Sequence, residues 1–324
     1  MSPAPGTDPF GPAASDLVWL ETRMLESLPR SGPELASFRR LVGAGGKRLR
    51  PALVMLSARL GTFDRERAGR AAIAVELVHA STLVHDDVID NAPTRRGRPT
   101  VAADHGEAAA IVVGDHFFAQ AYAMAAGAGA EVVSLLAGAV MDICRGELEQ
   151  QRTRYVYRLP ARSYDARIRG KTASLLASAC AIGAAVSGSG PAAQAALVAY
   201  GTHLGIAFQI VDDVLDYVGS EADVGKPVGH DLLEGHSTLP LMLAYSDPDL
   251  APRLDALLLA GHSAGPEVVS EVVRLVRGSG AVAQARRRAL LAARRAGSHL
   301  RTLPAGPARS ALEGLAGYVV DRSV

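Results

Sequence analysis

Two copies of one acidic pattern, Asp-Asp-x-x-Asp, constrain this chain more than any other feature. The first copy occupies residues 86–90 and the second residues 212–216, and each closes a long apolar segment. Residues four apart lie on one face of a helix, so the first and last aspartates of each copy point the same way. The six carboxylates belong to Asp86, Asp87, Asp90, Asp212, Asp213 and Asp216.

Such clusters predict a bound cation. Three carboxylates within little more than one helical turn repel one another, which is tolerable in solvent or beside a positive ion. Oxygen-only ligand sets suit hard cations, and Mg²⁺ in particular is held by a few carboxylates together with substrate phosphates. A single copy would indicate only a solvated helix end. Two copies at the ends of apolar segments favour two clusters that face each other across a cavity and hold a diphosphate through metal ions.

The rest of the chain has a helical pattern almost throughout. Apolar residues recur at spacings of three and four, whereas the alternating runs of half-buried strands are hard to find. We expect residues 15–324 to form one all-α domain, a bundle of helices around a large central cavity, after a disordered leader over residues 1–14. Helices are predicted at 15–28, 33–42, 51–60, 65–90, 105–127, 130–152, 161–187, 191–217, 237–246, 266–278, 280–302 and 307–321.

Composition excludes several classes of protein. A formal net charge of +1 and 5% aromatic residues argue against nucleic acid as the partner. The leader has no signal-peptide pattern, and no continuous apolar run approaches the ~18 to 20 residues that span a bilayer, so we expect no stable membrane insertion. Cys144 and Cys180 are isolated in apolar helical patterns, which predicts small core residues in a reducing, cytoplasmic setting.

Basic segments accompany the aspartates. Residues 45–51, Gly-Gly-Lys-Arg-Leu-Arg-Pro, place three cations after paired glycines at a helix start, where an anion would be held well. Residues 95–98, Arg-Arg-Gly-Arg, follow the first aspartate cluster, and arginine can clamp diphosphate oxygens bidentately. Each segment alone would be read as solvated loop. The arginine-rich stretch 152–169 is interpreted as a solvated surface.

In chain order these motifs resemble those of the trans-isoprenyl diphosphate synthases, the polyprenyl synthetase family. The resemblance extends from about residue 35 to the C-terminus, and the motifs are specific in combination although each alone is modest. The matching segments are Gly45–Pro51, His79–Asp90, Arg95–Thr100, Lys171-Thr172, Phe208–Asp216 and Gly225–Pro227.

The resemblance implies an all-α enzyme, usually a homodimer, that joins isopentenyl diphosphate to an allylic diphosphate. About three Mg²⁺ ions would be held by the six aspartates named above. The residues implied as catalytic are Asp86, Asp87, Asp90, Lys171, Asp212 and Lys226. The residues implied for the allylic diphosphate are Arg95, Lys171, Thr172, Gln209 and Lys226. Those implied for isopentenyl diphosphate are Lys47, Arg50, His79 and Arg96.

One position departs from the family pattern. The family's loop commonly reads Glu-Gly-Lys-x-Thr-Leu-Pro, and here His236 stands where the lysine is usual. An imidazole with its ordinary pKa of ~6.5 carries a positive charge only in part. We therefore expect weakened allylic binding or an altered pH dependence rather than a loss of activity.

Chain length in this family depends on the residues four and five positions before the first aspartate. Here they are Thr82 and Ser81, both small, so a growing product could pass that level. Phe117 and Phe118 could form a deeper floor, although such a pair is more often plain core. We favour a product of roughly six to ten isoprene units, about C30–C50, with geranylgeranyl diphosphate (C20) as the alternative.

Two rival functions remain. A class I terpene cyclase is also all-α and aspartate-rich, but it has no use for a second diphosphate site, and its second metal motif usually mixes Asn, Ser and Glu. A non-catalytic subunit of a partner synthase should have lost aspartates, whereas all six are present.

Overall fold

The computed structural model describes residues 9–29, 31–95, 97–219, 228–259 and 261–321. Over these residues the chain is helical nearly throughout, which confirms the predicted all-α class. The elements are η1 Gly11–Ala13, α1 Ala14–Ser27, α2 Pro33–Gly43, α3 Leu49–Ala58, α4 Arg65–Ile89, β1 Thr94–Arg95, β2 Arg98–Pro99, α5 Val101–His105, α6 Glu107–Ala128, α7 Ala130–Arg152, α8 Ala161–Ile168, η2 Arg169–Ala173, α9 Ser174–Val186, α10 Pro191–Val218, α12 His230–Leu233, α13 Leu239–Ala244, α14 Ala251–Leu257, α15 Pro266–Gly278, α16 Ala281–His299, η3 Leu300–Thr302 and α17 Pro307–Val320.

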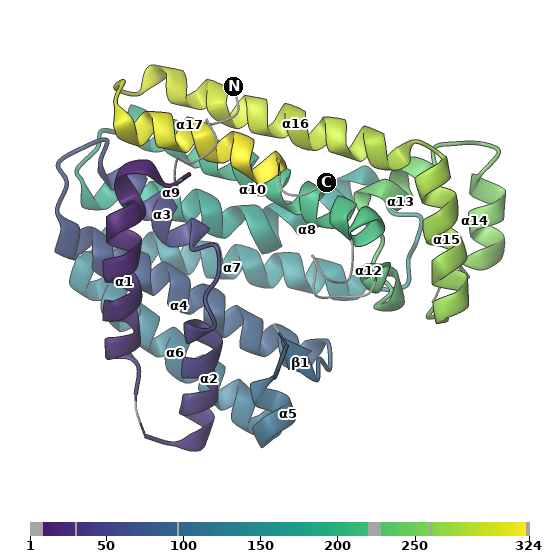
Figure 1. Cartoon of the computed structure of the whole chain (residues 1–324), viewed down its shortest axis with the longest axis horizontal. Coiled ribbons are helices and arrows are strands. Elements are labelled where there is room, and N and C mark those ends of the chain that lie inside the picture. Colours follow the sequence, from purple (N-terminus) through teal and green to yellow (C-terminus); the bar gives the residue numbers. More distant parts are fainter. Residues whose placement is uncertain (1–8, 30, 96, 220–227, 260, 322–324) are drawn as a thin grey trace.

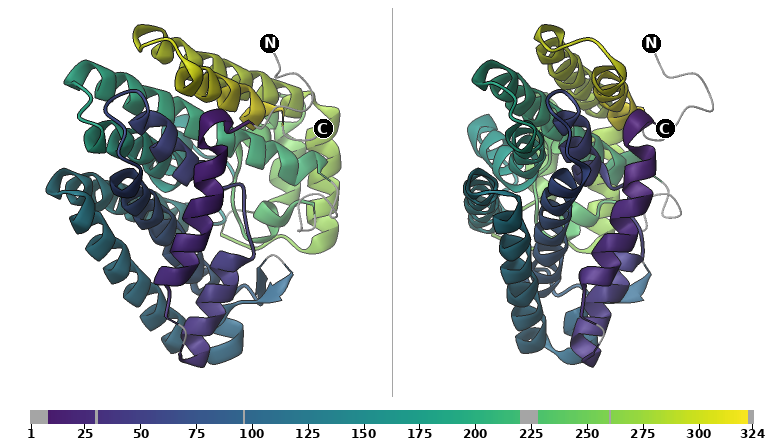
Figure 2. Two further views of the ribbon diagram at one scale, coloured as in Figure 1. Left: turned by 60° about the vertical axis from the view of Figure 1, so that its left-hand side comes forward. Right: turned by 90° about the vertical axis from the view of Figure 1, so that its left-hand side faces the viewer.

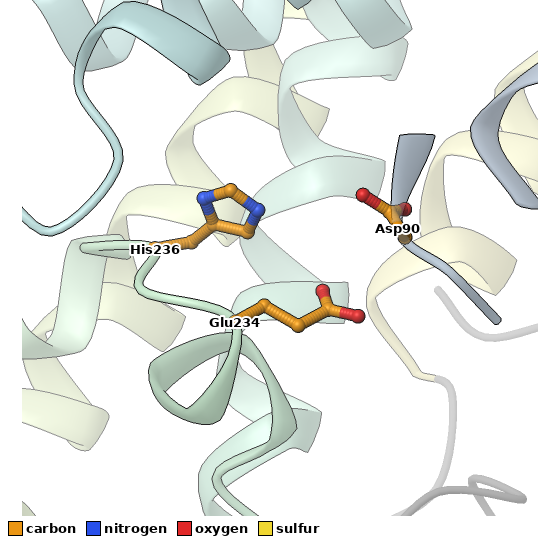
Figure 3. A group of neighbouring side chains, drawn as sticks. All are labelled: Asp90, Glu234 and His236. Atoms are coloured by element: carbon orange, nitrogen blue, oxygen red, sulfur yellow. The ribbon is translucent and has the colours of Figure 1, made fainter. Parts of the chain in front are cut away.

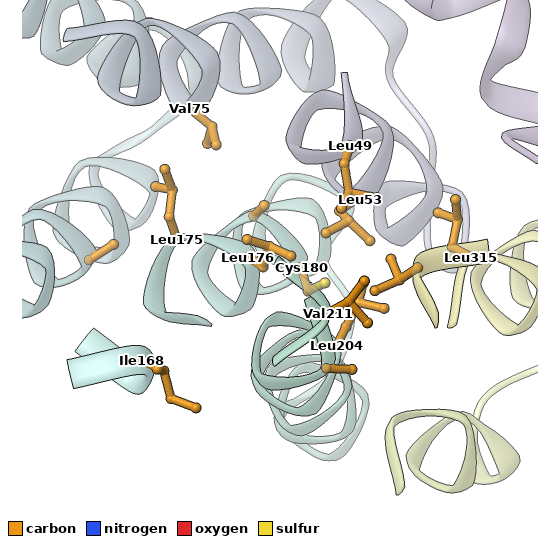
Figure 4. Packing of buried hydrophobic residues seen from close by; sticks show 14 of the residues in the cluster. Leu49, Leu53, Val75, Ile168, Leu175, Leu176, Cys180, Leu204, Val211 and Leu315 are labelled. Atoms are coloured by element: carbon orange, nitrogen blue, oxygen red, sulfur yellow. The ribbon is translucent and has the colours of Figure 1, made fainter. Parts of the chain in front are cut away.

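The two helices that carry the aspartates run through the bundle, as their apolar composition predicts. α4 packs against α3, α6 and α9, and α10 packs against α9 and α16 (Figure 1). Figure 2 shows α1 lying across the outside of the bundle. The core lies where α9 and α10 meet α3 and α17, and Figure 4 shows it with Leu53, Leu176, Cys180, Leu204 and Leu315.

Local sequence signals explain where these two helices begin and end. Asp64 caps α4, because its carboxylate accepts a hydrogen bond from the Arg67 amide at 3.1 Å. Pro191 opens α10 at a position where a missing N–H costs nothing. α4 ends at Ile89 and α10 at Val218, so each aspartate motif lies at the C-terminal end of its helix.

The structure corrects several boundaries. Residues 9–14 of the expected disordered leader are ordered, because Ala13 is fully buried and Phe10 packs against the core, and residues 1–8 lie outside the described residues. The helix predicted over 161–187 is interrupted by the five-residue π-helix η2. Gly106 separates α5 from α6, and α14 was missed. Cys180 is a core residue as predicted, but Cys144 is exposed.

Two further observations bear on the strands and on membrane insertion. Strands β1 and β2 form a two-stranded antiparallel sheet in which Arg95 pairs with Arg98, a feature too short for an alternating pattern to predict. Among the described helices, α10 is the one long and apolar enough to cross a bilayer by length and composition, and 44% of its most apolar window is buried. Core helices of soluble proteins meet the same criterion.

Candidate active site

Both aspartate motifs border one cavity of about 200 Å³ between α4, α7, η2, α10 and the segment around α12. This arrangement is the one predicted from the two copies of the motif. The lining residues are Asp86, Asp90, Arg95, Gln150, Arg167, Ile168, Lys171, Thr172, Gln209, Asp213, Asp231, Glu234, His236 and Thr238.

The first aspartate motif divides between two cavities. Asp86 and Asp90 line the larger cavity together, as their spacing of four predicts. Asp87 is buried and accepts a hydrogen bond from Nε of Arg95 at 2.5 Å. With Arg98, these two residues line a second cavity of about 110 Å³. Arg95 borders both cavities, so the ion pair with Asp87 fixes an arginine between them.

Asp86 lies beside a half-buried ion pair. Nζ of Lys171 lies 2.6 Å from Oε2 of Glu147, a residue that the sequence analysis did not identify. Burial raises the pKa of Asp86 to about 6; Lys171 opposes this rise, and Glu147 adds to it. Burial by itself would lower the pKa of Lys171, but the carboxylates of Asp86 and Glu147 have the larger combined effect and raise that pKa. The ammonium group is therefore held charged at the wall of the cavity.

A close helix contact places Lys171 there. A Cβ atom added to Gly146 of α7 would lie 2.3 Å from the backbone nitrogen of Lys171, and one on Gly170 would lie 2.7 Å from the carbonyl oxygen of Asp142. Only glycine lets α7 and η2 approach this closely. The π-helix at this point brings the side chains of Lys171 and Thr172 toward the cavity, and π-turns are frequent at functional sites.

A chain of hydrogen bonds reaches the second aspartate motif. The hydroxyl of Thr172 donates to Oε1 of Gln209 at 2.6 Å, and Nε2 of Gln209 donates to Oδ1 of Asp213 at 3.0 Å. The hydroxyl of Tyr164 donates to Oδ2 of Asp213 at 2.7 Å, and the amide of Leu239 donates to the same oxygen at 3.3 Å. Asp213 is thus held in one orientation by three partners.

The other two aspartates of that motif differ in burial. Asp216 is buried, and its Oδ2 accepts a hydrogen bond from the amide of Asp231 at 3.3 Å. Burial raises the pKa of Asp216 to about 8, and the neighbouring carboxylate of Asp231 adds to the rise. Asp212 is half-buried. Buried carboxylates that resist ionisation in this way are suited to a bound cation, so the donor set fits the expected Mg²⁺.

The basic residues at the start of α3 have different surroundings. Lys47 is exposed, and Arg50 and His79 are half-buried. Arg48 adopts a left-handed φ of +44° and turns inward to Glu76, at 2.7 Å, and to Glu21, at 2.9 Å. One of the three cations of this segment is therefore structural. Arg96 and Lys226 lie outside the described residues.

The four predicted chain-length residues lie along α4 and α6, which run antiparallel. At one end Nε of Arg67 donates to the carbonyl oxygen of Ala128, and at the other Nε2 of His85 lies 3.1 Å from the carbonyl oxygen of Ile111. Ser81 is fully buried and Thr82 is half-buried. The fully buried ring of Phe117 stacks on Phe38 of α2, with centroids 3.6 Å apart. Half-buried Phe118 lies 5.6 Å from the ring of His85.

Sequence reasoning missed several cavity residues. Arg167 lies in the stretch interpreted as solvated surface, but it is buried, and its guanidinium donates to the carbonyl of Ser237 at 2.7 Å. Tyr164, Arg167 and Lys171 are spaced three and four apart, which puts them on one face of a helix. The predicted role of Lys171 could therefore have identified Tyr164 and Arg167 as its neighbours. Glu234 and Asp231 carry no such signal, because their place depends on how the segment after α10 folds back.

His236 also faces the cavity. It lies close to Asp90 and Glu234: one ligand atom from each of the three residues lies within 4.8 Å of the other two ligand atoms (Figure 3). Burial lowers the pKa of His236 to about 4, and Arg167 lowers it further. The imidazole is consequently neutral near pH 7, which corrects the expectation of a partly charged substitute for lysine.

The chain was compared with known proteins. The family model described as "Polyprenyl synthetase" matches residues 35–276. Heptaprenyl diphosphate synthase component 2 of Geobacillus stearothermophilus is 40% identical over 81% of each chain. Octaprenyl diphosphate synthase of Escherichia coli is 35% identical over 87% of this chain and 88% of that one. A polyprenyl synthase of Caulobacter crescentus, solved with calcium and isoprenyl diphosphate, superposes with a TM-score of 0.89, at 34% identity over 96% of both chains. These likenesses confirm the prediction made from the motifs: the chain belongs to the polyprenyl synthetase family, the trans-isoprenyl diphosphate synthases.

Proposed function

We propose that the chain is a Mg²⁺-dependent prenyltransferase that condenses isopentenyl diphosphate head-to-tail with geranyl, farnesyl or geranylgeranyl diphosphate. The product would be an all-trans polyprenyl diphosphate of about C30–C50. The observation that carries the proposal is a single cavity bordered by both aspartate motifs and by Lys171, Thr172 and Gln209. The heptaprenyl and octaprenyl synthases among its relatives support the long product.

The allylic diphosphate would lie in this cavity. Asp86, Asp90 and Asp213 border it, and with the other three aspartates they would hold about three Mg²⁺ ions. Arg95 and Lys171, each paired with a carboxylate, would bind diphosphate oxygens. Thr172 and Gln209 would orient it, and Lys226 would add a further cation. Bound Mg²⁺ would stabilise the negative charge that develops on the departing diphosphate.

Isopentenyl diphosphate would bind beside the smaller cavity. Ala44, which directly precedes the paired glycines, lines that cavity together with Arg95 and Arg98. Lys47, Arg50, His79 and Arg96 are proposed to hold its diphosphate, so that its double bond reaches the allylic carbon as the C–O bond to diphosphate breaks. The allylic cation gains the new C–C bond, and the released diphosphate takes the proton lost from the adduct. Water must be kept out, or it would quench the cation to an alcohol.

The size of the product tests both the proposed activity and the proposed chain length. Because α4 and α6 run antiparallel and His85 lies beside Gly114, Phe118 comes one turn further along α6, near the level of Ser81. We propose that half-buried Thr82 and Phe118 border the path of the growing product. We expect the wild-type enzyme, given isopentenyl diphosphate, Mg²⁺ and farnesyl diphosphate, to make a ladder that ends at about six to ten units.

Thr82→Phe should shorten that ladder, because the larger ring blocks the path one turn below Asp86. Mass spectrometry of the dephosphorylated products measures both results. Thr202→Phe, at a half-buried threonine of α10 far from α4 in the chain, is the size-matched control. A wild-type product that stops at C20 would keep the family but contradict the length proposal. A released hydrocarbon or alcohol would indicate a cyclase, and no elongation at all would favour a non-catalytic subunit.

The outer face of α6 supports assembly with a second chain. α6 is rich in apolar residues, and two of them, Ile111 and Val112, are exposed, as is Met141 on neighbouring α7. Exposed apolar side chains that lie together mark interaction surfaces, so we propose that this face is covered in a homodimer. Native mass spectrometry should then give twice 33.7 kDa, and Val112→Glu should give the monomer. A monomer that elongates only with a second, different protein would contradict the homodimer. The name "component 2" of one relative is the reason to test for that outcome.

We further propose that residues 15–324 form one domain, because in the described part of the chain α9 packs against α3 and α4 of the half with the first aspartate motif and against α10, which carries the second. The enzyme would work in the cytoplasm without stable membrane insertion and without nucleic acid. Recovery of the chain in the membrane pellet after cell fractionation would contradict this localisation.

A further inference from the structure

The group formed by Asp90, Glu234 and His236 has the composition of a transition-metal site. Asp90 comes from the end of α4, and the other two come from the turn between α12 and α13 (Figure 3). Two carboxylates and one imidazole converge, and one ring nitrogen of His236 lies on the side of Asp90 and Glu234. The ligand atoms lie within 4.8 Å of one another, so small side-chain rotations would bring all three onto one ion.

The backbone holds two of these donors in place before any ion binds. The amide of His236 donates to the carbonyl of Asp231 at 2.7 Å, and Nε of Arg154 donates to the carbonyl of Glu234 at 2.8 Å. Gly235 between them has a φ of +84°, and a Cβ atom there would lie 2.3 Å from the ring of Tyr155. The turn therefore requires glycine, and it directs Glu234 and His236 to the same side.

The imidazole itself lacks the contacts expected of a buried polar ring. His236 is only 6% exposed, and among the described residues its Nδ1 has no hydrogen-bond partner. Its other ring nitrogen has one distant polar neighbour, Nε2 of Gln150 at 3.4 Å. A buried polar group without partners costs free energy unless something else satisfies it. Figure 3 shows Nδ1 on the side of the ring away from Asp90 and Glu234, so an ion held between the three residues would bind Nε2 and give that nitrogen a closer partner than Gln150.

The donor set decides which ions fit. Mg²⁺ prefers oxygen ligands and near-ideal octahedral geometry. An imidazole together with carboxylates suits first-row transition ions, whose affinity for such sites rises from Mn²⁺ toward Cu²⁺. We propose that Asp90, Glu234 and His236 form a site for a first-row transition ion such as Mn²⁺ or Co²⁺, which binds there with His236 as a nitrogen ligand.

This site shares Asp90 with the proposed Mg²⁺ ligands but does not depend on catalysis, because it is a binding property of the chain without substrate. Other aspartates will also bind Mn²⁺, so a count of ions does not test it. Pulsed electron paramagnetic resonance does, because a directly bound imidazole nitrogen modulates the Mn²⁺ echo with a stronger ¹⁴N coupling than nitrogens that only lie nearby. The aspartate motifs contribute oxygen alone.

The experiment uses the full-length chain, Mn²⁺ and no substrate. We expect ¹⁴N modulation from one imidazole in the wild type, and its loss in His236→Gln together with an affinity at that site lowered about 10-fold or more. His230→Gln is the matched control: His230 contacts Glu234 at 3.0 Å but does not belong to the group, so the modulation should persist. Thermal unfolding checks that each variant folds.

Two results would overturn the inference: a wild-type echo without ¹⁴N modulation, or modulation that survives in His236→Gln. If that variant does not fold, Glu234→Gln replaces it, and an unchanged Mn²⁺ affinity and unchanged modulation there would overturn the inference equally. If the wild type does not elongate any primer, the proposed function is contradicted, but the Mn²⁺ binding test is unaffected. The two failures are therefore distinguishable.

Discussion

Asp86→Asn should abolish elongation while leaving the fold intact. Asp86 faces the cavity beside Lys171, and the change removes one negative charge with almost no change in shape. Losing a single group that positions or stabilises the transition-state charge typically costs about 10²–10³ in kcat, and a metal ligand should cost at least as much. Incorporation of labelled isopentenyl diphosphate into extended product measures the effect at saturating Mg²⁺.

The matched control is Asp115→Asn, because Asp115 is 70% exposed on α6 and has the same chemistry outside the cavity. It should retain wild-type activity. Asp87→Asn is a less clean test, since Asp87 is buried and its loss would also release Arg95 from their 2.5 Å contact. Retention of more than about a tenth of the activity in Asp86→Asn would contradict the assignment of the first motif to the metal.

The sequence predicts much of this site because the signals are local. Asp86 and Asp90 share a face for reasons of helical spacing and were predicted, whereas Tyr164 and Arg167, which share a face with Lys171 for the same reason, were missed. The link from Thr172 to Gln209 joins two helices, yet both residues were identified through the family motif. What could not be predicted depends on contacts between distant segments, such as the approach of Gly146 to Gly170 that accompanies the π-helix.

His236 illustrates the same limit. Its replacement of a common lysine is visible in the sequence, and a partly charged imidazole is the natural expectation. Burial and nearby Arg167 are tertiary properties, and they keep the ring neutral instead. Its approach to Asp90 depends on a tertiary contact between the turn after α12 and the end of α4. A residue read as a weakened cation thus becomes a candidate ligand.

Metal-free protein should lose stability as the pH rises from about 6.5 to 8.5, and Mg²⁺ should restore it. Burial raises the folded-state pKa of Asp216 to about 8, far above the unfolded value near 3.8. The folded chain therefore binds more protons than the unfolded chain between these values, so its stability falls as pH rises through that window. Asp86, with a pKa of about 6, acts the same way at lower pH. We expect the Tm in EDTA to drop by several degrees over the upper part of the window.

Mg²⁺ binds the ionised carboxylates of the folded chain, so its stabilisation should be larger at pH 8.5 than at pH 6.5. Asp216→Asn removes the group that titrates there. In EDTA this variant should therefore show a smaller fall in Tm between the two pH values, while it also gains less from Mg²⁺. The exposed Asp115→Asn should behave as the wild type in both respects. His236 does not affect this comparison. Its pKa is lowered to about 4, so its contribution, which makes stability rise with pH, falls below pH 6.5. An equal Mg²⁺ shift at both pH values would show that the buried carboxylates are not where the metal binds.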